Sequence, residues 1–231
     1  MGLKPSQGEL NASIQPLFAH LPQVHVIRYD IVIAPVTVEE HLVVLDEVMQ
    51  ILSNACLTLN GVKCVFGQDE IAFWGMIVSA DGVRSDPEKV KALENLATPT
   101  NKEELVSFLC MMQSNSDFIP DFSKKAAFLR ELTKKGCRFV WSEKHESSFR
   151  SLVSSFKNDV LLRYFDCSLP AFIVVDGHVS GLGAMLMQGS SLQDARPVAV
   201  ASRTTSTSEK HCPQLDLEAL SQDFGLRRFR E

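Results

Sequence analysis

The stretch FIVVDGHVSGLGAMLMQ at residues 172–188 decides the fold of the second half of the chain. Two apolar runs lie on either side of a polar, glycine-containing turn, a pattern typical of paired strands. PVAVASR at residues 197–203 adds a third run, so the segment predicts an antiparallel meander. Its first strand carries Asp176, and an unpaired carboxylate is costly to bury on an apolar strand. Asp176 is therefore a candidate metal ligand or a hydrogen-bonded turn residue before Gly177.

The segment HVIRYDIVIA at residues 25–34 has a similar character near the other end of the chain. Its two apolar triplets surround Arg28, Tyr29 and Asp30, which predicts a tight hairpin with Asp30 in the turn. In that position Asp30 either hydrogen-bonds the turn or retains some affinity for a metal ion.

Helices are expected between these two strand regions. Thr37 and Glu40 form a capping box, which predicts a helix over residues 38–54. Short strands should follow around Cys64–Phe66 and Ile71–Val78, closed by a turn. Four helices are then expected from Pro87 to Leu96, after a cap at Thr100, from Ser123 to Lys135, and from Ser142 onward.

A last helix is expected to begin at Pro213, because proline suits the first turn of a helix. Leu217, Leu220 and Phe224 would form its buried side. The same helix carries Glu218, which by itself is typical of a solvated residue on a helix.

Composition places the chain among ordinary globular proteins: 45% of its 231 residues are hydrophobic and 22% are charged. No run approaches the roughly 18 apolar residues of a membrane helix, and the polar opening lacks the apolar core of a secretory signal. We therefore expect an intracellular protein, cytoplasmic or nuclear, that is not secreted and has no membrane partner. The six cysteines are scattered, which favours reduced and mostly buried thiols over a zinc site.

The net charge of −5 argues against a chain that coats nucleic acid by bulk electrostatics. A local basic face could still bind a phosphate backbone. The candidate residues lie on one stretch: Lys124, Lys125, Arg130, Lys134 and Lys135, with Arg138 nearby. The alternative is an ordinary solvated helix face.

Several short motifs follow one another along the chain. They are Glu40–His41–Leu42, Lys63–Cys64, Phe73–Trp74–Gly75 with Ser79 and Gly82, Asp86–Pro87–Glu88–Lys89, Ser107–Phe108–Leu109, Phe118 to Ser123, and Phe139–Val140–Trp141. In this order, and with Tyr29–Asp30 before them, the sequence resembles the reverse transcriptase and RNase H portion of the Pol polyprotein of gypsy-type LTR retrotransposons. The resemblance covers nearly the whole chain, from Gly2 to Arg230.

The resemblance implies a polymerase centre in which three aspartates hold two divalent cations for nucleotide transfer. Two of these aspartates belong to the hairpin, and the third belongs to an earlier strand, before the start of this chain. Tyr29 occupies the first hairpin position, so only Asp30 remains. A phenol is a poor magnesium ligand because its pKa of about 10 keeps it protonated at neutral pH. Efficient DNA synthesis by this chain is therefore not expected.

The same resemblance assigns Asp176 and Glu218 as metal-binding carboxylates of an RNase H-like domain, where Mg²⁺ supports cleavage of RNA paired with DNA. Two further aspartates of the family's set are expected beyond Glu231, so the domain is expected to be truncated and to hold half a site. The candidate catalytic and metal-binding residues are thus Asp30, Asp176 and Glu218.

The expected fold class is α+β: the end of a polymerase palm hairpin sheet with its helix, a helical thumb and connection, and the first half of an RNase H-like mixed sheet with its helix. These parts are assigned to residues 1–83, 84–137 and 138–231. The implied activities are RNA-directed DNA polymerisation (nucleotidyltransferase) and hybrid-dependent endonuclease cleavage, in a copy that is catalytically defective. The expected partners are an RNA/DNA hybrid or single-stranded nucleic acid and the remainder of the Pol polyprotein. The alternative is a non-catalytic nucleic-acid-binding module or a domesticated interaction protein.

Overall fold

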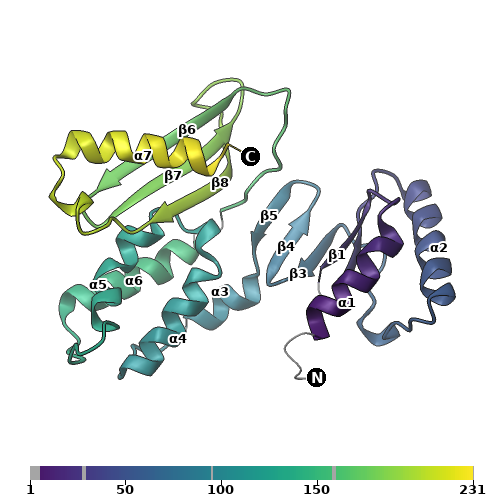
Figure 1. The fold of residues 1–231 in the computed structure, drawn as a ribbon, viewed down its shortest axis with the longest axis horizontal. Coiled ribbons are helices and arrows are strands. Elements are labelled where there is room, and N and C mark those ends of the chain that lie inside the picture. The colour runs from purple at the N-terminus through teal and green to yellow at the C-terminus, as the bar shows by residue number, and fades with distance from the viewer. Residues whose placement is uncertain (1–5, 28–29, 95, 158–159, 231) are drawn as a thin grey trace. The chain divides into compact units, whose positions relative to one another are not determined.

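The computed structural model describes residues 6–27, 30–94, 96–157 and 160–230 (Figure 1). The chain divides into two compact units between Gln68 and Asp69. The domain boundaries expected after residues 83 and 137 stay predictions. The α+β class is confirmed, since both units combine helices with small antiparallel sheets.

The first unit is a two-stranded hairpin packed with helices. Its elements are α1 (Ser6–Ile14), η1 (Gln15–Phe18), β1 (Val24–Ile27), β2 (Asp30–Ile33), α2 (Val38–Asn54) and η2 (Gly61–Lys63). Strands β1 and β2 pair antiparallel, and α2 begins where the Thr37 hydroxyl accepts a hydrogen bond from the Glu40 backbone N–H at 3.2 Å. The helix predicted over residues 38–54 is confirmed. Its buried face, formed by Val44, Val48 and Leu52, packs on Phe18, Leu21 and Val24.

The second unit contains the remaining elements. They are β3 (Glu70–Phe73), β4 (Met76–Ser79), β5 (Gly82–Ser85), α3 (Pro87–Glu94), α4 (Lys102–Gln113), η3 (Ser116–Phe118), α5 (Phe122–Leu132), α6 (Glu143–Lys157), β6 (Ala171–His178), β7 (Gly181–Gln188), β8 (Arg196–Arg203), η4 (Glu209–His211) and α7 (Gln214–Arg228). The meander predicted over residues 172–203 is confirmed, with β7 between β6 and β8.

Two strand predictions were wrong. No strand covers residues 64–66, which follow the short helix η2 without regular structure. The run expected as one strand over residues 71–78 is a hairpin, since Trp74 and Gly75 both have positive φ values, 56° and 75°. Two such residues in succession are typical of a tight hairpin turn.

Several helix limits also differ from the predictions by a few residues. Helix α4 is capped by Asn101 rather than Thr100, because the Asn101 side chain accepts from the Glu104 N–H at 2.9 Å. Helix α5 ends at Leu132, before Lys135. On α7, Leu217 is fully buried as expected, but Leu220 and Phe224 are only partly buried.

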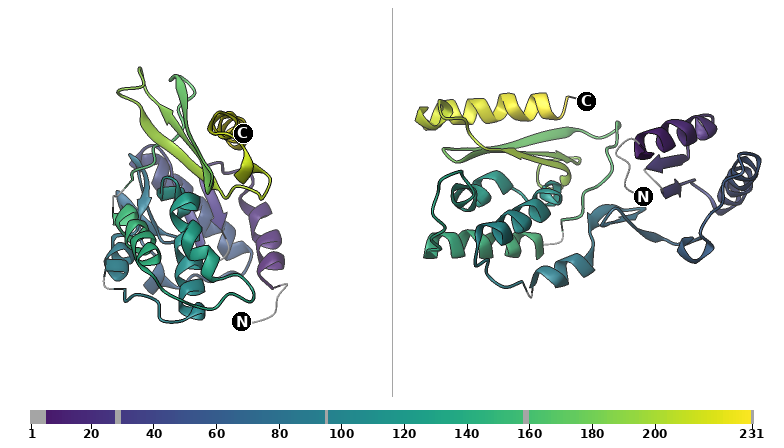
Figure 2. Two further views of the ribbon diagram at one scale, coloured as in Figure 1. Left: turned by 90° about the vertical axis from the view of Figure 1, so that its left-hand side faces the viewer. Right: turned by 60° about the horizontal axis from the view of Figure 1, so that its bottom comes forward.

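The sheet β6–β7–β8 is covered on both faces. Helix α7 packs on β6 and β7, whereas α5 packs on β7 and β8, and Figure 2 shows the strands between α7 and the group of helices α3–α6. That group has its own apolar core, which includes the fully buried Phe122, Phe149 and Phe156.

The expectation of mostly buried cysteines was wrong. All six are free thiols, of which Cys56, Cys110, Cys137 and Cys167 are exposed and the other two are partly exposed. Within the described ranges, none of the helices is both long and apolar enough to cross a membrane.

Candidate functional site

Asp176 lies within β6, two residues before the strand ends, and its side chain is half exposed. The Lys124 ammonium, on α5, donates to the Asp176 Oδ2 at 3.0 Å. The desolvation cost expected for a buried carboxylate is therefore absent here, because the side chain retains both water and a cationic partner.

Glu218 lies on α7, which covers the opposite face of β6. Gly177 faces that helix: a Cβ at Gly177 would lie 2.4 Å from the Leu217 carbonyl oxygen. Successive strand residues point to opposite faces, so the neighbouring Asp176 side chain points away from α7, which agrees with its contact to Lys124. Asp176 and Glu218 thus belong to adjacent stretches of backbone, but Asp176 points to the face covered by α5 and Glu218 belongs to the helix on the other face.

The Gln214 side chain joins the two backbones. Its Nε2 donates to the Gly177 carbonyl oxygen at 2.8 Å and to the Glu218 Oε1 at 3.3 Å. This contact fixes the start of α7 on β6, and it links the exposed Glu218 carboxylate to the amide group that binds Gly177.

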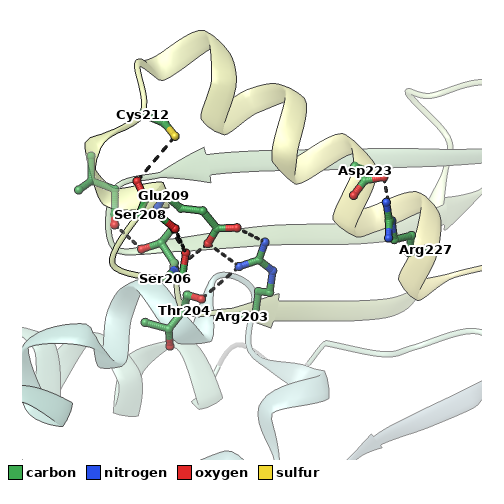
Figure 3. Close-up of polar contacts among 10 residues, drawn as sticks. Arg203, Thr204, Ser206, Ser208, Glu209, Cys212, Asp223 and Arg227 are labelled. Carbon is green, nitrogen blue, oxygen red and sulfur yellow. Dashed lines mark hydrogen bonds and ion pairs between the residues drawn. The ribbon is translucent and has the colours of Figure 1, made fainter.

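The turn before α7 is fixed by a bidentate ion pair (Figure 3). The Arg203 guanidinium donates to both carboxylate oxygens of Glu209, at 2.7 and 2.8 Å, and the Ser206 N–H donates to the same carboxylate at 2.7 Å. These bonds, first of all those from Arg203, lower the pKa of Glu209 from its usual value of 4.5 to about 2. The ion pair positions the chain between β8 and α7.

Asp30, in the first unit, is the first residue of β2 and pairs with Ile27. Its side chain is exposed. The neighbouring Arg28 and Tyr29, and with them the predicted turn and the substituted metal position, lie outside the described residues.

The described residues do not fit a two-metal centre. Among them, no three histidine, cysteine or acidic side chains gather closely enough to hold an ion, and the Asp176 carboxylate already has Lys124 as its cation. The expectation of Mg²⁺ ligation by Asp30, Asp176 and Glu218 stays a prediction.

The basic residues predicted to track a phosphate backbone separate into two groups. In the first group, Lys124 pairs with Asp176, Lys125 donates to the Pro120 carbonyl oxygen at 2.7 Å, and Arg130 donates to Thr204 and Gln113 at 2.7 and 2.6 Å. Burial lowers the pKa of both Lys125 and Arg130. Lys124 and Arg130 thus hold α5 against other elements of the second unit, and Lys125 fixes the turn before the helix.

The second group lies beyond the end of α5. Lys134, Lys135 and Arg138 are exposed, and their side chains have no acidic partner among the described residues. Lys102, at the start of α4, lies beside them, because its Nζ donates to the Lys134 carbonyl oxygen at 2.6 Å. We call the three exposed cations Lys134, Lys135 and Arg138 the basic corner, and the contact from Lys102 supports its backbone. The sequence analysis missed Lys102, because no local pattern links residues 32 positions apart.

Comparison with known proteins agrees with this architecture. Residues 141–231 match the family model described as an RNase H-like domain found in reverse transcriptase. The Tf2-3 transposon polyprotein of Schizosaccharomyces pombe is 26% identical over 231 residues, covering 99% of this chain, and the Pol polyprotein of the Drosophila melanogaster transposon gypsy is 28% identical over 213 residues, covering 87%. The chain is similar to the reverse transcriptase and RNase H region of LTR retrotransposon Pol polyproteins. The predicted resemblance is thereby confirmed.

The chain spans only 17% and 20% of the length of those two polyproteins. Its fold is shared with a foamy viral protease–reverse transcriptase solved in complex with an RNA/DNA hybrid, with a TM-score of 0.84 at 23% identity, over 99% of this chain and 31% of the viral one. A second structure of the viral protein, in complex with double-stranded DNA, matches 99% of this chain and 48% of its own, again with a TM-score of 0.84. Proteins of the reverse transcriptase and RNase H family generally use divalent metal ions.

Proposed function

We propose that this Pol region binds an RNA/DNA hybrid or a DNA duplex through the basic corner, and that it holds the nucleic acid without cleaving it. The observation that carries the proposal is the division of the cations. Lys124, Lys125 and Arg130 are occupied by contacts within the protein, whereas the side chains of Lys134, Lys135 and Arg138 are exposed to solvent.

The charge of the whole chain makes a local contact necessary. A net charge of −5 repels a polyanion at long range. Binding must therefore come from cations close to one another, and the basic corner concentrates three of them after the end of α5. The nucleic-acid complexes of the foamy viral protein support the choice of ligand.

Hydrolysis of the RNA strand is the activity that the family suggests, but the described carboxylates do not support it. A two-metal mechanism needs several acidic groups around one pair of ions, whereas Asp176 contacts Lys124 and Glu218 lies on the helix that covers the other face. The alternative is a domesticated interaction protein without nucleic-acid affinity. The binding measurement distinguishes the two, because only our proposal expects binding.

The test is fluorescence anisotropy with a labelled hybrid at two salt concentrations. If three phosphate contacts are made, affinity should fall about 40-fold between about 50 and about 200 mM salt, because each contact contributes about 0.9 to the slope of log K against log salt. The triple variant K134Q/K135Q/R138Q should lose most of that dependence.

The matched control is K63Q/K210Q/R228Q, which removes the same charge from exposed positions elsewhere. It should retain nearly the wild-type affinity. Equal losses in the two triple variants would indicate bulk electrostatics, and undetectable binding by the wild-type protein would reject the proposal. A cleavage assay of the same hybrid with Mg²⁺ should give intact RNA.

A further inference from the structure

The segment that joins α6 to the RNase H-like sheet passes between two strand edges. Strand β5 is the last strand of the sheet β3–β4–β5, and β8 is the last strand of the sheet β6–β7–β8. Neither edge has another strand beside it among the described elements, and such edges expose unpaired backbone groups.

Leu162 pairs with the edge of β5. Its N–H donates to the Val83 carbonyl oxygen at 2.9 Å, and the Val83 N–H donates to the Leu162 carbonyl oxygen at 2.8 Å, which makes an isolated antiparallel bridge. The next residue turns to the other sheet: the Arg163 N–H donates to the carbonyl oxygen of Pro197, in β8, at 2.8 Å. Two consecutive residues therefore join the two sheets by backbone hydrogen bonds.

Tyr164 and Gly82 reinforce this junction. The Tyr164 hydroxyl donates to the Ser79 carbonyl oxygen, at the end of β4, at 2.9 Å. Gly82 has a φ of +141°, and a Cβ there would lie 2.2 Å from the Leu162 carbonyl oxygen. Only glycine allows the two backbones to approach this closely in that conformation.

We propose that Leu162–Tyr164 is a positioning strap, which fixes the β3–β4–β5 hairpin sheet to the RNase H-like sheet so that the two move as one body. The strap carries no ligand and takes part in no reaction. Its consequence is that a displacement of β8 is transmitted to the Trp74–Gly75 turn at the tip of the hairpin. The proposal concerns the protein alone and is independent of nucleic-acid binding.

Hydrogen exchange of the full chain, measured at increasing urea concentration, tests the strap. In the wild-type protein the amides of Val83, Leu162 and Arg163 should open together with those of β8, with the same free energy and the same urea dependence. Hairpin amides that open separately, at a free energy well below that of β8, would overturn the proposal.

Variants give an independent measurement. Y164F removes one hydrogen bond and should accelerate exchange of the hairpin amides a few-fold. G82A should accelerate it about tenfold or more, while amides of β6 and β7 keep their rates. The control is G136A, because Gly136 also has a positive φ, +79°, but nothing lies within 4 Å of its added Cβ.

G136A should change hairpin exchange no more than it changes exchange of the β6 and β7 amides. Unchanged hairpin exchange in both Y164F and G82A would reject the strap. Should G82A fail to fold, Y164F and the wild-type urea series still decide the outcome.

Discussion

Alanine at Gly177 should separate α7 from β6. The added Cβ would lie 2.4 Å from the Leu217 carbonyl oxygen, 2.5 Å from its carbon and 2.8 Å from the Glu218 nitrogen. All three are backbone atoms of α7, so no side chain can rotate to relieve the overlap. The helix must shift by about 1 Å to restore an ordinary contact distance.

The free-energy cost follows from what that shift disturbs. Leu217 and Ser221 are fully buried against the sheet, and overpacking of such an interface costs about 1–3 kcal/mol. The gain from replacing a strand glycine by alanine, about 0.5–1 kcal/mol, offsets only part of this. We therefore expect G177A to lower the free energy of unfolding by about 1–2 kcal/mol, which shifts a urea midpoint by about 0.5–1 M at a slope of about 2 kcal/mol/M.

G183A is the matched comparison, because Gly183 pairs with Asp176 in the neighbouring strand. Its added Cβ would meet the Asp121 Oδ1 at 2.2 Å, but the next atom lies at 3.5 Å. The Asp121 carboxylate can rotate away, so G183A should unfold within about 0.5 kcal/mol of the wild-type protein. Equal midpoints for G177A and the wild type, or equal losses in both variants, would refute the reasoning.

Three further predictions concern stability measured by urea unfolding. The pKa of Glu209 is lowered to about 2 in the folded state, so its stabilising contribution is complete at pH values above its usual pKa of 4.5 and is lost as pH falls toward 2. E209Q should therefore weaken the fall in unfolding free energy between about pH 5 and pH 3. F149A should cost about 3–5 kcal/mol, because Phe149 is fully buried, whereas the exposed Phe128 should tolerate alanine within about 0.5 kcal/mol. A double-mutant cycle on Lys124 and Asp176 should give a coupling below about 1 kcal/mol, since both side chains are half exposed, and a larger value would indicate a buried pair.

Local patterns predicted the regular elements of this chain well. The capping box at Thr37 and the strand runs after residue 171 depend on residues close in sequence, and both appear as expected. The hairpin at Trp74–Gly75 was missed because tryptophan rarely adopts a positive φ. An apolar run with a large aromatic residue in its middle therefore predicts a single strand.

The candidate site was harder to predict, because its properties depend on which face of the sheet each residue occupies. The apolar residues around Asp176 suggested a buried position. Strand alternation instead places its carboxylate on the side of α5, where Lys124, 52 positions earlier in the chain, pairs with it. The basic residues of α5 likewise looked equivalent in sequence.

What separates those basic residues is where the helix ends. Within α5, Lys124 contacts β6, Lys125 contacts the preceding turn, and Arg130 contacts Gln113 and Thr204. By contrast, Lys134 and Lys135 follow Leu132, where the chain leaves the helix. A charge that contacts a partner within the protein is unavailable to a phosphate, because moving it would leave that partner unsatisfied. The difference between a packing lysine and a binding lysine on this chain is therefore set by tertiary contacts, and the paired triple variants measure it directly.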